Sequence, residues 1–544
     1  MEFFIRGFVT VLRYVLPVLS VLMLSVCAVG LLKKRVKPYK LVLTTDDDKE
    51  LLLQSGEYII GSDNDCDITL DGVKERHAVL SISNNYMSIR PIGKSKIGIN
   101  KKSIRDEKKF GPEDLVSMGD REFSVILKRN KERPTGNEAF KKSVAFALLN
   151  IIQFFVLLSM CFAYSDKAKV LFMCFGILIV GEWVYMLITR FLGAFLEIPV
   201  LFMVTLGLSV AAHSSGANVI KLIVCFAAGI IGAVFLSKLI VNPKIAVGFK
   251  GVALIVGIAL FTVNILFGVI YNGSQNWLNI KGVSFQPSEF IKIILVYVSG
   301  AAADKLSDKK DIVSFSVFAA FCLMVLAYLS DFGTLLIYGV CLTAMLFIRL
   351  CNIKLLGIMT GTAVLGGGLV VLLFPYVAKR IFAFGSAFEN AADSGYQQTR
   401  TMVAAASGGL FGVGGGNGTL VKVSAYDTDI VFGLIVEEWG LIIGLCVLFC
   451  FLLFALYAVK TLKVSSSNFY STTCCAAAVL LLVQTSLNVF GSLDMLPFTG
   501  VTLPFISNGG SSLISCTCLM AFFRVAVRDE HIILKERRRK GAKA

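Results

Sequence analysis

Long apolar runs recur along the chain from about residue 143 onwards. Each is close to the ~20 residues with which an α-helix crosses ~30 Å of hydrocarbon. The runs lie near 143–164, 168–190, 194–213, 218–240, 250–271, 286–304, 312–330, 332–350, 354–375, 430–457, 470–491 and 510–527. An earlier run near 8–32 is followed at once by Lys33, Lys34, Arg35 and Lys37. Because a cleaved signal peptide carries its charge before the apolar core, this run predicts an uncleaved anchor whose C-terminal side is cytoplasmic.

Residues 38–132 follow a different pattern, in which short apolar runs alternate with turn residues. Strands at this spacing predict a small all-β sandwich, and positive stretches on both sides place it in the cytoplasm. The predicted fold class is an all-α polytopic membrane protein, with about twelve core transmembrane helices and an N-terminal anchor helix, that also carries this cytoplasmic sandwich. We divide the chain into an anchor (8–32), the sandwich (38–132), additional transmembrane helices (143–240), a transmembrane core (250–527) and a basic cytoplasmic tail (528–544).

Composition agrees with a membrane protein, since 56% of the residues are apolar, 17% are charged and the mean hydropathy is +0.75. Soluble domains carry about 25% charged residues and disordered chains are poor in apolar ones, so both classes are excluded. A net charge of +16 is typical of nucleic-acid binding in soluble proteins. In membrane proteins, however, Lys and Arg collect in cytoplasmic loops and set the orientation. The cysteines lie mostly inside apolar runs and predict neither a disulfide framework nor a zinc site.

One connection, 376–429, is much longer than the others and lies outside the cell by the count of spans. Long connections in compact proteins are usually functional or disordered. Its glycine-rich centre (408–418) could contact phosphate oxygens through backbone N–H groups. Asp429 at its end could accept a proton from a sugar hydroxyl, while Arg400 and Lys422 offset a pyrophosphate charge. The alternative is a merely flexible loop.

Ionisable residues at the ends of membrane spans are costly to bury, so each is a candidate for function. The sequence Gln286-Pro287-Ser288-Glu289 suits a helix start, and Glu289 can pair with Lys292 on the same helix face. The alternative is a neutralised pair that only stabilises the bundle. Asp331, at an outer turn between two spans, is by itself best explained as a helix cap.

Residues 494–512 contain two prolines and three glycines and cannot form a regular span. Irregular backbone at membrane depth is tolerated only where protein buries it or where it lines a wet cavity. We therefore predict a re-entrant segment that lines an outer cavity, with a purely structural kink as the alternative.

Over roughly residues 250–530 these motifs resemble the SEDS family, the shape, elongation, division and sporulation proteins that include RodA, FtsW and SpoVE. The motifs that carry the resemblance are Trp277 with Phe285–Lys292, Asp331-Phe332-Gly333-Thr334, Gly395-Tyr396-Gln397, Gly408–Gly414, Asp429 with Glu437-Glu438, and Leu496–Ser512. The chain departs from the family pattern where Asp427 replaces His, where Gln275-Asn276 replaces two Arg, and where Arg400 replaces Gln.

The resemblance implies a peptidoglycan glycosyltransferase that polymerises lipid II on the outer membrane face for elongation, division or sporulation. It also implies a class B penicillin-binding protein as partner. Asp429 would be the general base or would position a divalent cation, Mg²⁺ or Mn²⁺, and no organic cofactor is expected. The expected substrate-binding residues are Glu289, Lys292, Trp277, Gln286, Asp331, Gln397, Arg400, Lys422, Glu438, Ser507 and Ser511.

The β-sandwich resembles a forkhead-associated (FHA) domain. The motifs are Gly61, Asp67-Ile68-Thr69-Leu70, Arg76-His77-Ala78 and Ser95–Asn100. Three positions that read phosphothreonine in this family are replaced by Ser62, Lys74 and Ile97, which removes charge-assisted hydrogen bonds to a phosphate. We therefore expect a cytoplasmic domain that binds a protein partner, with phosphothreonine recognition as the less favoured alternative.

Two rival functions use the same features. A lipid II flippase would need polar residues through the full depth of the membrane, whereas the candidates here crowd the outer half. A non-catalytic cell-wall scaffold would have lost the acid of the long loop, and Asp429 is present. We therefore favour the enzyme, placed as a multi-pass protein of the plasma membrane with its active-site loop outside the cell.

Overall fold

The computed structural model describes residues 2–540 except for short stretches. These stretches are 33–38, 46–49, 54–55, 64–65, 71, 83–86, 94, 101, 105, 112–113, 120, 130–137, 190, 192, 242–245, 247, 272, 281–282, 305–308, 351–352 and 466. Two stretches used in the sequence analysis lie outside the described residues. They are the positive cluster at 33–37, from which the orientation of the anchor was predicted, and the last residues of the tail, 541–544. The chain divides into a helical unit (1–33, 137–463 and 467–527) and a second unit formed chiefly by residues 34–136.

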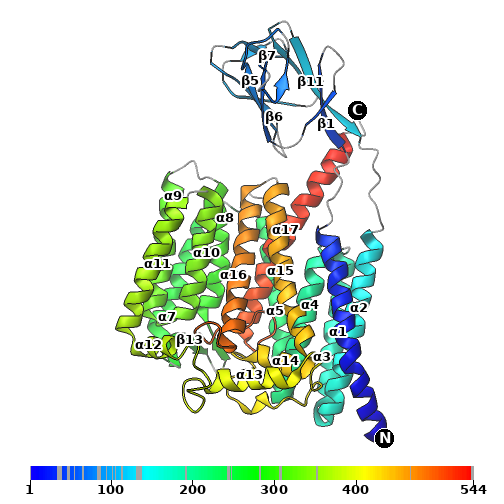
Figure 1. Ribbon diagram of the computed structural model, residues 1–544, viewed down its shortest axis with the longest axis vertical. Helices are drawn as coiled ribbons and strands as arrows, with labels where there is room; N and C mark the ends of the chain where they lie inside the picture. The colour runs from blue at the N-terminus through cyan, green and yellow to red at the C-terminus, as the bar shows by residue number, and fades with distance from the viewer. Residues whose placement is uncertain are drawn as a thin grey trace. The chain divides into compact units, whose positions relative to one another are not determined.

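The helical unit consists of long helices that pack side by side with nearly parallel axes (Figure 1). They are α1 (Glu2–Leu32), α2 (Glu138–Ala163), α3 (Ala168–Thr189), α4 (Ala194–Ser214), α5 (Gly216–Ile240), α7 (Lys250–Phe267), α8 (Pro287–Asp304), α9 (Lys309–Tyr328), α10 (Phe332–Leu350), α11 (Ile353–Leu373), α15 (Leu441–Val464), α16 (Asn468–Ser492) and α17 (Gly510–Lys540). Among the described residues, nine helices are long and apolar enough to cross a membrane. The predicted multi-pass fold is confirmed.

Burial separates the central helices from the peripheral ones. In the most apolar stretch of α4, 94% of the residues are buried inside the protein, whereas in that of α7 only 22% are buried. A helix that is apolar on all sides and buried on all sides belongs to the interior of a bundle. The exposed residues of α7, such as Ile255 and Leu266, are apolar and suit contact with lipid.

The expectation of one continuous span after the long connection was wrong. The predicted span at 430–457 is two helices, α14 (Val431–Trp439) and α15, that meet at Gly440. Gly440 has a φ of +89°, and a Cβ there would lie 2.3 Å from the carbonyl oxygen of Leu410. The connection before it also contains helices, α12 (Pro375–Phe382) and α13 (Tyr396–Gly408), and a short 3-10 turn at Leu420–Lys422.

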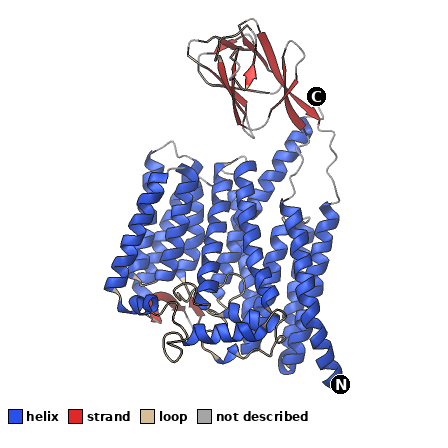
Figure 2. Cartoon of the chain, viewed as in Figure 1, coloured by secondary structure: helices blue, strands red, loops and turns tan. Residues whose placement is uncertain are grey.

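A small sheet that the sequence did not predict follows α7, which ends at Phe267 (Figure 2). It has three antiparallel strands in the order β12 (Val269–Tyr271), β13 (Ser274–Ile280) and β14 (Val283–Phe285). The sheet, α12, α13 and α14 all lie at the same end of the helical unit (Figure 1).

The second unit is the predicted β-sandwich. One sheet has six strands in the order β2-β1-β11-β10-β7-β8, and the other has five in the order β4-β3-β5-β6-β9. The strands are β1 (Tyr39–Thr45), β2 (Glu50–Leu53), β3 (Gly56–Gly61), β4 (Ile68–Thr69), β5 (Ala78–Ile82), β6 (Met87–Pro91), β7 (Ile97–Ile99), β8 (Lys102–Ile104), β9 (Lys108–Phe110), β10 (Leu115–Met118) and β11 (Arg121–Arg129). Inward-facing residues of both sheets, including Ile60, Leu80, Val116 and Val125, are fully buried in one apolar core. Alternation of inward and outward side chains is what the short apolar runs predicted.

Candidate active site

A cavity of about 2140 Å³ opens in the helical unit at the end that carries the small sheet. Its apolar walls come chiefly from α9, α10 and α11, which also contribute hydroxyl groups such as those of Ser316 and Thr343. Most of its polar lining comes from β13, the start of α8, residues 424–429 and the irregular segment 496–510. The charged side chains that line it are Lys221, Glu289, Asp331, Arg380, Asp427 and Asp429. Ligand sites are typically concave and mostly apolar, with few polar groups that fix orientation, and this cavity has that character.

Asp429 is held in this cavity through its own backbone and that of its neighbours. The Asn488 amide of α16 donates to the Asp429 carbonyl oxygen at 2.9 Å and to the Val501 carbonyl oxygen at 2.7 Å. The Ser507 hydroxyl donates to the Thr428 carbonyl oxygen at 2.7 Å. These bonds fix the acidic segment against the irregular segment. Residues of the irregular segment line the cavity, as predicted.

The carboxyl group of Asp429 lies against Gly500. A Cβ at Gly500, whose φ is +72°, would stand 3.3 Å from Asp429 Oδ2, so a residue without a side chain lets the acid approach the backbone. Burial raises the pKa of Asp429 to about 6, and the negative charge of Asp427 adds to the rise. The Thr428 hydroxyl and the positive charge of Arg380 act in the opposite direction.

Glu289 and Lys292 form the predicted pair, with Lys292 Nζ 2.6 Å from Glu289 Oε2. Lys292 is 1% exposed and also donates to Gln484 Oε1 at 2.8 Å, while Ser515 donates to Glu289 Oε2 at 2.8 Å. Of the two charged residues, Glu289 lines the cavity and Lys292 does not. Lys292 therefore pairs with the Glu289 carboxylate on the side away from the cavity. Because its ammonium group is buried there, it is not available to a substrate phosphate.

Asp331 caps α10, as its position between two spans predicted, because its Oδ1 accepts from the Thr334 N–H at 3.0 Å. Its other oxygen accepts from the Asn276 amide of β13, which also donates to the Ser288 hydroxyl. Asp331, Asn276 and Thr334 line the cavity together with Trp277 and Gln286. The cap thus joins the small sheet to the starts of α8 and α10.

Comparison with known proteins decides the family. A family model of FtsW, RodA and SpoVE, described as cell cycle protein, matches residues 182–531, well over half of the chain. The chain belongs to this family. The probable peptidoglycan glycosyltransferase FtsW of Enterococcus hirae is 30% identical to it over 295 residues, which cover 51% of this chain and 73% of the relative. The stage V sporulation protein E of Bacillus subtilis is 30% identical over 261 residues, 45% of this chain and 69% of the relative.

Solved structures and a second family model complete the comparison. A chain from a peptidoglycan synthase complex that coordinates polymerization and crosslinking has a TM-score of 0.52 at 23% identity. The alignment covers 62% of this chain and 97% of that chain, and it concerns the fold. An FHA domain model matches residues 58–119, within the β-sandwich.

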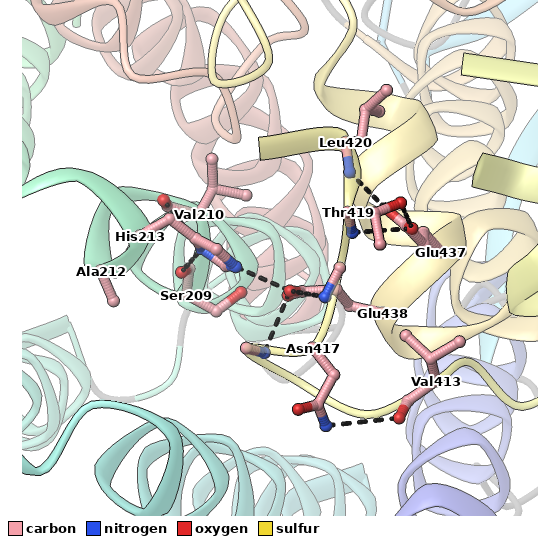
Figure 3. A network of polar contacts seen from close by, with 12 residues as sticks. Ser209, Val210, Ala212, His213, Val413, Asn417, Thr419, Leu420, Glu437 and Glu438 are labelled. Atoms are coloured by element: carbon pink, nitrogen blue, oxygen red, sulfur yellow. Dashed lines mark hydrogen bonds and ion pairs between the residues drawn. The ribbon is translucent and has the colours of Figure 1, made fainter. Parts of the chain in front are cut away.

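In this member of the FtsW/RodA/SpoVE family the glycine-rich run has a different role from the predicted contact with phosphate. The N–H groups of Gly416 and Gly418 both donate to Glu438 Oε1 at 3.0 Å, and His213 Nε2 of α4 lies 2.6 Å from the same oxygen (Figure 3). Glu437 holds the next stretch, accepting from the Thr419 N–H at 2.8 Å. These donors are already used within the protein.

Close packing explains why the run is so rich in glycine. A Cβ at Gly412 would lie 2.1 Å from the Glu438 carbonyl oxygen, and one at Gly408 would lie 2.3 Å from that of Val436. Because larger residues would collide with the backbone of α14, the run packs directly against this helix. Glu438 was predicted to bind substrate; at 1% exposure it instead anchors the run.

The other predicted substrate-binding residues divide into two groups. Trp277, Gln286, Glu289, Asp331 and Gln397 line the cavity with Asp429. Within the described residues, Lys292, Arg400, Lys422, Glu438, Ser507 and Ser511 are not part of that lining. Arg400 stacks on the ring of Tyr396, with its guanidinium carbon 5.4 Å from the ring centroid. Lys422 is exposed and ends the 3-10 turn.

Two cations that line the cavity were missed from the sequence. Lys221 lies in the first turns of α5 and approaches Gly510, where a Cβ would lie 3.5 Å from the Lys221 Cε. Arg380, in α12, donates to the Phe498 carbonyl oxygen at 3.4 Å and influences Asp429 electrostatically. A Lys within an apolar run is costly to bury, and this was the available signal for Lys221.

A divalent cation fits the lining residues only together with substrate. In the part of the chain that the structure describes, no three His, Cys, Asp or Glu side chains come together as a metal site. Asp427 and Asp429 do line the cavity together. Mg²⁺ is commonly bound by one or two carboxylates plus substrate phosphates and water, so this pair suits a cation that enters with a pyrophosphate.

Proposed function

We propose that this protein is a peptidoglycan glycosyltransferase that polymerises lipid II. The observation that carries the proposal is Asp429, which has a carboxyl group with a raised pKa and a backbone held by α16 and by the irregular segment, in the lining of a large, mostly apolar cavity. The membership in the FtsW/RodA/SpoVE family and the names of the curated relatives support the same activity. The apolar walls between α9, α10 and α11 suit polyprenyl tails.

In the proposed reaction, a sugar hydroxyl of the acceptor lipid II attacks the anomeric carbon of the lipid-linked glycan. The new glycosidic bond forms with inversion as the bond to undecaprenyl pyrophosphate breaks. Asp429 accepts the hydroxyl proton, and a pKa near 6 suits a base that works close to neutral pH. Lys221 and Arg380 offset the negative charge of the leaving pyrophosphate.

A divalent cation is part of the proposal as an aid to the leaving group. In the alternative role of Asp429, this carboxylate and Asp427 would hold Mg²⁺ or Mn²⁺ together with substrate phosphates, and the cation would supply additional positive charge against the pyrophosphate. Glu289, supported by Lys292, is proposed to position a sugar by accepting a hydrogen bond from one of its hydroxyl groups.

We further propose that the cavity opens on the outer face of the plasma membrane and that the FHA domain and the tail are cytoplasmic. The positive charge of the sequence near 33–37 and 528–540 supports this orientation. The proposed partners are a class B penicillin-binding protein, as the fold match to a peptidoglycan synthase complex suggests, and a cytoplasmic protein bound by the FHA domain.

Placement of the charges favours catalysis over transport. Glu289 lies in the first turn of α8, Asp331 precedes α10, and Asp427 and Asp429 precede α14. The charged residues of the described lining therefore lie towards one end of the helices, and deeper polar residues such as Ser316 and Thr343 carry only hydroxyl groups. A lipid II flippase would need strongly polar groups through the full depth.

The test is polymerisation of labelled lipid II by the purified full chain, with and without a class B penicillin-binding protein. Asp429→Asn should lower the rate by roughly 100-fold or more, the usual contribution of a general base. Glu389→Gln, an exposed carboxylate of the same connection, serves as the matched control and should retain the wild-type rate. Wild-type protein that makes no glycan under either condition, or an Asp429→Asn variant as fast as wild type, would refute the assignment.

A further inference from the structure

A second cavity, of about 310 Å³, lies between α3, α4, α5 and α17 and shares no described lining residue with the active-site cavity. Its walls are largely apolar, and α5 and α17 meet closely behind it, where Cys518 Sγ contacts the Gly229 carbonyl oxygen at 3.6 Å. Ile177 and Ile231 line the cavity and are 53% and 70% exposed. The cavity therefore opens on the outer surface of the helical unit, where lipid chains would lie.

One end of this cavity is polar. Arg524 of α17 donates from Nη1 to the Tyr185 hydroxyl at 2.7 Å, and this hydroxyl donates to Glu197 Oε1 at 2.6 Å. Glu182 lies one turn away from Tyr185 on α3, and its Oε1 accepts from the Gln153 amide at 2.6 Å. Four of these side chains, Glu182, Tyr185, Glu197 and Arg524, line the cavity.

The hydrogen-bonding capacity of this polar end is incompletely used. Glu182 is 3% exposed, yet its Oε2 has no partner among the described residues, and the same holds for Glu197 Oε2. A buried acceptor without a donor carries a desolvation penalty, so such groups are normally satisfied by protein, water or a ligand. The Arg524 guanidinium has five N–H donors, of which one is engaged by Tyr185 within the described residues.

The polar end lies near the ends of the helices. Glu182 and Tyr185 are in the last two turns of α3, Glu197 is in the first turn of α4, and Arg524 is in the last turn of the apolar part of α17. Since α3 rises about 1.5 Å per residue, Glu182 lies roughly 10 Å from the end of its helix. The cavity therefore has a polar head close to one membrane boundary and an apolar body at greater depth.

We propose that this cavity is a binding site for one amino-phospholipid of the phosphatidylethanolamine type. Two buried carboxyl oxygens at the polar end have no donor among the described residues and the guanidinium has unused N–H groups, so this end suits a ligand that brings both an N–H donor and an anionic acceptor. The primary ammonium of the headgroup donates to Glu182 Oε2, and the phosphate accepts from the free N–H groups of Arg524. One acyl chain lies along the apolar walls formed by Leu201, Phe226 and Met520. The site is separate from the glycosyl-transfer cavity and acts as a structural lipid site.

The test is native mass spectrometry of the delipidated full chain with lipids that share their acyl chains. Phosphatidylethanolamine has a primary ammonium, phosphatidylcholine has a quaternary one without N–H groups, and phosphatidylglycerol has no cation. The wild-type protein should bind phosphatidylethanolamine roughly tenfold more tightly than either of the others, the ratio expected for one charge-assisted hydrogen bond. Equal affinity for all three lipids, or a preference for phosphatidylglycerol, would overturn the proposal.

Two variants and one control localise the binding. Glu182→Gln should abolish the preference for phosphatidylethanolamine over phosphatidylcholine. Gly181→Leu should abolish binding of all three lipids, because a Cβ there meets open space within the lining. Gly176→Leu, on the same helix and also facing open space but outside the lining, should bind as wild type. If Glu182→Gln does not purify as a monodisperse protein, the comparison of Gly181→Leu with Gly176→Leu decides, and equal lipid binding by these two variants contradicts the site.

Discussion

Replacing Asp429 by Asn should make the protein more stable at the same time as it removes activity. The folded protein raises the pKa of this carboxyl from its ordinary value of 3.8 to about 6. Each pH unit of such a rise corresponds to about 1.4 kcal/mol, so ionised Asp429 costs the folded state about 2–3 kcal/mol. Because the folded state binds the proton more tightly, the cost is absent below pH 4, grows between pH 4 and 6, and is complete above pH 6.

The assay is the thermal unfolding of the detergent-purified chain at pH 4.5 and at pH 8. At pH 8 the Tm of Asp429→Asn should exceed that of wild type by a few degrees, and at pH 4.5 the difference should shrink. Glu389→Gln should change neither value. The polymerisation rate of the wild type should fall below about pH 6 as Asp429 takes up its proton. A Tm for Asp429→Asn that is below wild type at pH 8, or a difference independent of pH, would refute this account of the carboxyl group.

Three further substitutions test the supports of the site. Glu438→Gln weakens the hydrogen bonds from three donors and should lower the free energy of unfolding by about 2–4 kcal/mol. It should also speed proteolysis of the glycine-rich run, and its effect should be smaller in a protein that already carries His213→Gln. Gly500→Ala places a Cβ 3.3 Å from Asp429 Oδ2 at a positive φ, so polymerisation should fall more than tenfold while the chain stays folded; an unchanged rate would contradict this contact. Lys292→Met leaves the buried Glu289 carboxylate without its cation and should lower the free energy of unfolding by about 3–5 kcal/mol. Changing Glu289 to Gln as well should restore part of this stability.

The helical fold could be predicted because the length and apolar composition of a segment are enough to identify a membrane span, whatever the segment packs against. The break at Gly440 could not, because it depends on a close contact with the carbonyl oxygen of Leu410, which is distant in the sequence. The sheet after α7 was also missed, since strands of three residues such as β12 and β14 are too short to show alternation.

For the site, the sequence predicted the acids more accurately than the cations. Asp429, Glu289 and Asp331 stand in long motifs and all line one cavity. Arg400 was selected because it lies near the acids along the chain, whereas Lys221, more than 200 residues away in sequence, is the cation that the fold brings to the cavity. The role of Glu438 depends likewise on His213, a long-range partner that no local pattern reveals.

Asn488 joins the acidic segment to the irregular segment with a single amide, and it does so from inside α16. The position of the Asp429 backbone therefore depends on a membrane helix as well as on the long connection that carries it. A small molecule that displaced this amide from its two carbonyl oxygens would shift the acid away from its working position. Such an inhibitor would need no resemblance to a sugar or to a pyrophosphate, and substrate accumulation would not relieve its effect.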